Sequence, residues 1–284
     1  NCSFDNKSGI WKTENNVAVK QDDAFEDFKT ISSSEEIFNE IITIKENYDF
    51  KSSSLKSNYN WNDIYFSKTN NSINFKYNDT NQLVLKSKKL TKYNINNFIF
   101  FEKNNLIVND EKGNIIIFSV TKNKIIAKFN FYKKKYKKIE KKLNLIVEND
   151  VIYVSDNIGY LYAYNYNLNK ILWAKNYNIP FRSNLKLSKN KLIAANQNNN
   201  LYFFNKDTGD ELSLIPTEET IVKNQFVNNL SIGDDSLFFL NTYGSLYSVD
   251  IKTMRINWFI NLNQSFDLNP SNIFFGSKII TFDN

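Results

Sequence analysis

Residues 152–174 read IYVSDNIGYLYAYNYNLNKILWA, and this stretch decides the fold because its pattern recurs along the chain. A short apolar run leads to a polar turn that ends in Gly159. An alternating strand, a second polar turn and a closing strand with Trp173 follow. Alternation of β-branched and aromatic residues with polar ones predicts short β-strands, and the turns carry the Gly, Asn and Asp that tolerate positive φ.

The same pattern is found five times, at residues 64–86, 106–128, 152–174, 192–214 and 237–259. Its turn markers are Asn71, Gly113, Gly159, Asn199 and Gly244, which lie 42, 46, 40 and 45 residues apart. Fourteen positions after each marker lie Leu85, Ala127, Trp173, Ser213 and Trp258. Two anchors at a fixed offset indicate a true repeat. With the apolar run between units, each repeat offers four short strands, the size of a β-propeller blade.

The sequence therefore predicts an all-β propeller of four-stranded blades. Five complete units are expected at residues 57–90, 91–136, 139–178, 181–216 and 221–262, with part of a sixth at 268–284. Because a blade cut after its second strand leaves an unpaired edge, we expect a fragment of an intact ring of seven or eight blades. The alternative is a ring closed by the N-terminal segment. Residues 1–56 are predicted to be a polar tether or linker, with a candidate closing strand at 38–44.

The composition excludes several kinds of active site. The chain has no His and one Cys, so a Ser-His-Asp triad, a Cys-His pair, an imidazole zinc site and an internal disulfide cannot be built from it. The sequence offers no candidate catalytic, cofactor-binding or metal-ligating residue. Acidic pairs at residues 22–23, 26–27 and 35–36 are interpreted as solvating the tether.

The net charge of +6 invites comparison with nucleic-acid-binding proteins. Only Arg182 and Arg255 are arginines, however, and arginine is the residue that reads guanine edges and forks onto phosphate. No specific nucleic-acid partner is therefore expected. The densest run, KKKYKKIEKK at residues 133–142, is interpreted as a solvated loop, and the alternative is contact with an anionic membrane surface.

The motifs GYLYAY…NKILW at residues 159–173 and GSLYSVD…W at 244–258, with the turn KDTG at 206–209, resemble the quinoprotein-type (PQQ-like) repeat family of β-propellers. In that family the Trp docks one blade against the next, so the resemblance implies this packing for Trp173 and Trp258. Tyr160, Tyr164 and Tyr166 alternate along one strand. They are expected to pack between blades, with protein contacts as the alternative use.

Within that family the chain is most similar to the BamB-like propeller lipoproteins of outer-membrane β-barrel assembly. The opening NCSFDNKSGIW is similar to the start of such lipoproteins, with Cys2 as the residue that would carry lipid. The resemblance implies a non-enzymatic, cofactor-free scaffold on the periplasmic face of an outer membrane, or in the periplasm, that binds the barrel assembly complex. A quinone-dependent dehydrogenase or its degenerate relative, and a generic propeller interaction module, are the alternatives.

Overall fold

The computed structural model describes residues 2–5, 10–13, 55, 60–72, 74–75, 82–83, 85–220, 225–262 and 276–282. The chain divides into two compact units, Asn1–Phe50 and Lys51–Asn284. In the first unit, β1 (Cys2–Asp5) and β2 (Ile10–Thr13) form an antiparallel hairpin in which Cys2 pairs with Thr13. The predicted tether thus contains a hairpin, while the candidate closing strand at 38–44 lies outside the described residues.

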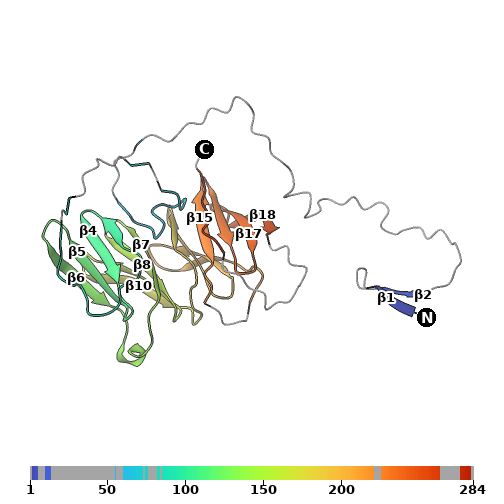
Figure 1. Cartoon of the computed structure of the whole chain (residues 1–284), viewed down its shortest axis with the longest axis horizontal. Coiled ribbons are helices and arrows are strands. Elements are labelled where there is room, and N and C mark those ends of the chain that lie inside the picture. The colour runs from blue at the N-terminus through green and yellow to red at the C-terminus, as the bar shows by residue number, and fades with distance from the viewer. Residues whose placement is uncertain are drawn as a thin grey trace. The chain divides into compact units, whose positions relative to one another are not determined.

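In its described residues the second unit has four antiparallel sheets of four strands, each strand paired with its neighbour in the sequence (Figure 1). The first sheet holds β3 (Phe100–Glu102), β4 (Asn105–Asn109), β5 (Asn114–Ser119) and β6 (Lys124–Asn130). The second holds β7 (Leu143–Glu148), β8 (Val151–Asp156), β9 (Tyr160–Asn165) and β10 (Lys170–Asn176). The third holds β11 (Lys186–Ser188), β12 (Lys191–Ala195), β13 (Leu201–Asn205) and β14 (Glu211–Ile215). The fourth holds β15 (Asn229–Gly233), β16 (Ser236–Leu240), β17 (Ser245–Asp250) and β18 (Arg255–Asn261).

This arrangement confirms the predicted all-β class with four-stranded blades. Each sheet falls within one predicted unit, from 91–136 to 221–262. A 3₁₀ helix, η1 (Lys134–Tyr136), lies in the connection from the last strand of the first sheet to the first strand of the second. No helix in the described part of the chain is long and apolar enough to cross a membrane.

Successive sheets pack face to face through three separate hydrophobic cores. Side chains alternate across each strand, so one face of a sheet packs on the preceding sheet and the other on the next. The core between the first two sheets includes Ile117, Val154 and Tyr162. The next includes Trp173 and Phe204, and the last includes Phe203 and Phe239. Neighbouring Phe203 and Phe204 therefore serve different cores, which is how a row of blades is held together.

The described residues of the first predicted unit, 57–90, form turns and isolated bridges instead of a sheet. Residues 61–70, here called the inner segment, run along the first strands of all four sheets. The Trp61 N–H donates to Phe101 O beside β3 (2.7 Å), and the Val147 N–H of β7 donates to Asn62 O (2.9 Å). The inner segment continues past β11 and β15, where the Ile232 N–H donates to Lys68 O (2.8 Å). The structure thus has four blade-like sheets in its described residues where the sequence predicts five complete units.

The predicted sixth unit, 268–284, is described only over residues 276–282. These residues carry no assigned strand but lie beside β15 and the inner segment. The Thr281 N–H donates to Thr69 O (3.0 Å), and the Asn229 side chain donates to Gly276 O (2.9 Å).

Candidate functional site

The repeat anchors occupy equivalent places in the four sheets. The turn markers lie between the second and third strands with positive φ, at 78° for Gly113, 102° for Gly159, 68° for Asn199 and 83° for Gly244. The residue fourteen positions later always pairs with the residue four positions after the marker. These pairs, each beside a β-bulge, are Ala127 with Ile117, Trp173 with Ala163, Ser213 with Phe203 and Trp258 with Ser248. Asn71 and Leu85 lie outside the four sheets.

A further turn residue, which the sequence reasoning missed, precedes each marker by three positions. Asp110, Asp156, Asn196 and Asn241 accept hydrogen bonds from the backbone of their own turns. Asp156 Oδ1, for example, accepts from the N–H groups of Ile158, Gly159 and Tyr160, each at 2.8 Å. Short Asp and Asn side chains stabilise turns in this way. The corresponding residue before Asn71 is Lys68, which was the available signal that the first unit differs.

The two repeat tryptophans have contrasting surroundings. Trp173 is 8% exposed and its indole N–H donates to Lys206 O in the third sheet (2.8 Å). Its ring rests on Gly209, where a Cβ would come within 2.7 Å of Trp173 Cδ2. Trp258 is 43% exposed, and its ring centre lies 6.0 Å from that of Phe238 within its own sheet. Only Trp173 therefore docks one blade on the next in the described structure.

The three alternating tyrosines, Tyr160 and Tyr164 in β9 and Tyr166 directly after it, also differ in their surroundings. Tyr164 and Tyr166 are buried, and the Tyr166 hydroxyl donates to Glu102 and Asp150 (both 2.9 Å). Tyr160 is half-buried and its hydroxyl contacts that of Tyr136 (2.9 Å). Tyr164 and Tyr166 belong to the core between the first two sheets, and Tyr160 packs against this core while it also contacts the loop that follows β6.

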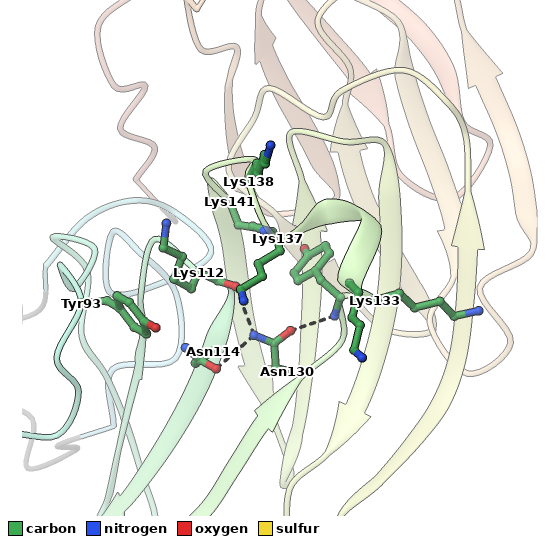
Figure 2. A pocket seen from close by; sticks show the side chains of 10 residues that line it. Tyr93, Lys112, Asn114, Asn130, Lys133, Lys137, Lys138 and Lys141 are labelled. Carbon is green, nitrogen blue, oxygen red and sulfur yellow. Dashed lines mark hydrogen bonds between the residues drawn. The ribbon is translucent and has the colours of Figure 1, made fainter.

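The Lys-rich run at 133–142 lies in that loop, which contains η1 and joins β6 to β7. The loop and the β4–β5 turn enclose a pocket of about 730 Å³ (Figure 2). Lys141 is buried beside it. The predicted solvated loop thus forms one wall of a defined concavity.

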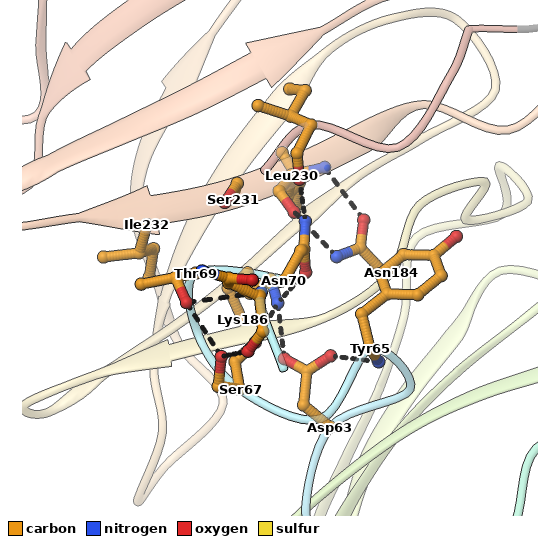
Figure 3. A network of polar contacts seen from close by, with 12 residues as sticks. Asp63, Tyr65, Ser67, Thr69, Asn70, Asn184, Lys186, Leu230, Ser231 and Ile232 are labelled. Atoms are coloured by element: carbon orange, nitrogen blue, oxygen red, sulfur yellow. Dashed lines mark hydrogen bonds and ion pairs between the residues drawn. The ribbon is translucent and has the colours of Figure 1, made fainter. Parts of the chain in front are cut away.

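A buried polar network joins the inner segment to the third and fourth sheets (Figure 3). The Lys186 ammonium, fully buried in β11, donates to Asp63 Oδ2 (2.5 Å), Asn70 Oδ1 (2.6 Å) and Ser67 O (3.0 Å). Burial raises the pKa of the Asp63 carboxyl and lowers that of the Lys186 ammonium, while their mutual attraction opposes both shifts. Asn184 continues the network by bonding Leu230 in both directions, at 2.8 Å each. All three ammonium protons are used in holding the inner segment to the third sheet.

A second network surrounds Glu218, in the connection between the third and fourth sheets. Its carboxylate accepts from the side chains of Asn241 (2.6 Å), Ser245 (2.7 Å) and Tyr247 (2.7 Å). Burial alone would raise the pKa of Glu218, but these hydrogen bonds together lower it below its usual range. The carboxylate therefore ties the connection before β15 to the β16–β17 turn and β17. No group of three or more His, Cys, Asp or Glu that could hold a metal ion occurs in the described residues.

The most exposed apolar surface of the four sheets lies on β18. All seven of its residues are exposed, whereas each of the other outer strands, β6, β10 and β14, has at least one covered residue. Trp258 and Ile260 lie on one face of the strand. Phe259, 59% exposed, lies on the other and stacks on Tyr247 with ring centres 5.5 Å apart. Exposed apolar residues on an edge strand are typical of a surface that pairs with another chain.

Four-stranded antiparallel sheets follow one another along the chain, and the repeat anchors pair at the same register within each sheet. This arrangement defines a β-propeller protein. No protein-family model matches the chain, and no curated protein matches it. Among solved structures it is similar to BamB from Moraxella catarrhalis, with a TM-score of 0.48 and 12% identity over 57% of this chain. The match spans 47% of the length of that BamB chain.

Two other solved structures are similar to the same degree. The computationally designed Ika4 protein has a TM-score of 0.49 and 13% identity, over 61% of this chain and 99% of its own. The Cps50 (Swd1) β-propeller domain of Myceliophteria thermophila has a TM-score of 0.46 and 12% identity, over 58% of this chain and 56% of its own. At these identities the likenesses concern the fold alone.

Proposed function

We propose that this chain is a non-catalytic β-propeller scaffold that binds a protein partner through β18. The observation that carries the proposal is that all seven residues of an outer strand are exposed, among them Trp258, Phe259 and Ile260 at 43%, 59% and 42%. A partner strand added beside β18 would hydrogen-bond to the backbone along its outer edge, and its side chains would cover these apolar residues. Burying each of them would contribute about 1 to 2 kcal/mol.

The partner in this proposal is a component of an outer-membrane β-barrel assembly complex, and the chain acts as a BamB-like lipoprotein on the periplasmic face. This finer assignment is supported by the repeat motifs around Trp173 and Trp258 and by the lipoprotein-like opening with Cys2. Radiolabelled fatty acid should be incorporated into the chain in cells, and the substitution Cys2→Ser should abolish the label. A label retained by Cys2→Ser would remove the proposed anchor.

Site-specific photo-crosslinking in cells tests the partner surface. A photo-reactive amino acid in place of Ile260 should capture a barrel-assembly component that is identified with antibodies to the individual components. Leu168, 67% exposed in the β9–β10 turn, is the matched control position and should give no such product. Equal capture from both positions would refute the β18 surface. A specific product from Ile260 without any barrel-assembly component would refute the BamB-like assignment and retain the scaffold.

A further inference from the structure

Three parts of the chain line the pocket beside the Lys-rich loop, and the third runs from the end of β6 into the loop that follows it. Tyr93 precedes β3, Lys112 and Asn114 belong to the β4–β5 turn and the start of β5, and Asn130 ends β6 (Figure 2). The loop after β6 supplies the other lining residues, which are Tyr132, Lys133, Lys134, Lys137, Lys138 and Lys141. A volume of about 730 Å³ lies within the usual range for pockets that hold small molecules.

All the charged residues in the lining are positive. It contains six lysines and no carboxylate, although the chain as a whole has 30 acidic residues against 36 basic ones. None of the six forms an ion pair with any carboxylate of the described residues. The neighbouring acids have other partners: Asp110 accepts from Thr91 (2.8 Å) and Asp156 from Tyr132 (2.6 Å). The Asp156 carboxylate opposes the lowering of the Lys141 pKa, so nearby acids offset only part of the positive charge of the six lysines.

The loop is held in place in spite of this mutual repulsion. Hydrogen bonds tie it to the β8–β9 turn, where the Asn157 side chain donates to Glu140 O (3.0 Å) and accepts from the Lys142 N–H (2.9 Å). The Lys141 N–H donates to Glu111 O in the β4–β5 turn (2.9 Å). The loop is thus anchored on both the first and second sheets. A pre-formed wall lowers the ordering cost that a ligand would otherwise meet.

Lys141 and Gly113 form the closest part of this wall. The Lys141 ammonium donates to Tyr136 O and lies 5.4 Å from the ring centre of Tyr132. Gly113 makes room for both side chains, because a Cβ there would lie 2.5 Å from Tyr132 Cε2 and 3.1 Å from Lys141 Cγ. Burial and the nearby Lys112 lower the pKa of Lys141. A bound anion would relieve this repulsion.

We propose that this pocket binds a small anion with at least two phosphate groups, either free or as a lipid headgroup. Lysine provides a compact ammonium with three donor protons, which suits phosphate oxygens approached from several directions. Six lysine side chains line this one concavity, which suits an anion with several negative charges better than one with a single charge. Because the wall is concave and small, the ligand is a compact anion and not a nucleic-acid chain. This site is formed by the β4–β5 turn of the first sheet and the loop after β6, so the proposal is independent of β18.

Titration calorimetry with the whole chain tests the proposal. Sodium tripolyphosphate probes the free anion, and vesicles of phosphatidylcholine with or without cardiolipin probe the headgroup. Tripolyphosphate binding supports a free ligand, and binding only to cardiolipin vesicles supports the headgroup. Absence of both, or equal affinity for inorganic phosphate and tripolyphosphate, overturns the proposal. Tighter binding to single-stranded DNA than to either probe would also overturn it.

Charge-matched variants separate the pocket from general attraction. The double substitution Lys112→Gln with Lys137→Gln should weaken binding by about tenfold or more, equal to about 1.4 kcal/mol. Lys122→Gln with Lys170→Gln removes the same charge from exposed lysines outside the pocket and should change affinity less than about twofold. Equal losses in the two variants would refute a defined site. Unchanged melting temperatures of both variants serve as the folding control.

Discussion

Removal of the Lys186 ammonium group tests how the inner segment is held. In Lys186→Met the buried Asp63 loses its counter-charge, and Asn70 Oδ1 and Ser67 O lose their donor. At pH 7, protonation of a carboxyl whose ordinary pKa is 3.8 costs about 4.4 kcal/mol, at about 1.36 kcal/mol for each pH unit. This cost agrees with the 3 to 5 kcal/mol typical of a broken buried ion pair. We expect the free energy of unfolding to fall by about 4 kcal/mol.

The pH dependence identifies the cause of this loss. In the variant the folded-state pKa of Asp63 lies above its unfolded value, so stability is lost as the pH rises through that interval. The deficit relative to the unaltered protein should therefore shrink to about 2 kcal/mol at pH 5. In the double variant with Asp63→Asn, the stability deficit should be the same at pH 5 and pH 7, because the Asp63 carboxyl is then no longer present to titrate.

Urea unfolding followed by tryptophan fluorescence and far-ultraviolet circular dichroism measures these effects, with Lys170→Met on the exposed surface of β10 as the control. The control should change the free energy of unfolding by less than about 0.5 kcal/mol. A Lys186→Met deficit below about 1 kcal/mol at pH 7 would refute the reasoning. A deficit of equal size at pH 5 and pH 7 would show that the unpaired carboxyl is not its source.

Three further predictions concern the contacts between sheets. Each is measured by urea unfolding as the change in the free energy of unfolding. Trp173→Ala should cost about 3 to 5 kcal/mol and Trp258→Ala less than about 1 kcal/mol, and equal costs would contradict the docking role of Trp173. Gly209→Ala should cost about 1 to 3 kcal/mol, because its φ is 73° and its Cβ would strike the indole; a neutral result would contradict this close contact. Glu218 stabilises the fold above its ordinary pKa of 4.5 and less as the pH falls through its lowered folded value, so Glu218→Gln should flatten stability below pH 4.5. An unchanged pH profile would contradict the last prediction.

The sequence allowed the blades to be predicted because their determinants are local. Turn residues with positive φ, such as Gly159 and Gly244, and strand alternation lie within a few residues of one another. The pairing of each second anchor across a bulge follows from this regular spacing. The inner segment could not be predicted, since its pattern of apolar residues resembles a strand and only Lys68, in place of Asp or Asn, marks it as different.

The candidate surfaces depended on long-range packing, which the sequence alone does not reveal. Trp173 and Trp258 occupy the same repeat position, yet only one meets a following sheet. The lysines at 133–142 read as a solvated run until the anchored loop and Lys112 are seen to share a pocket. From the sequence alone Lys186 would be placed on the surface, because lysine is rarely buried without a partner and its partner Asp63 is distant in the chain.

The inner segment also has a consequence for synthesis on the ribosome. Asn70 bonds Leu230, which lies 160 residues later in the chain. At about 5 to 20 residues per second, roughly 8 to 30 seconds separate the synthesis of the two residues. During that interval each sheet can form from its own neighbouring strands, while the segment that links them waits without its last partners. The four sheets can therefore form one after another, and Asn70, which is made before all of them, is among the last residues to gain its partners.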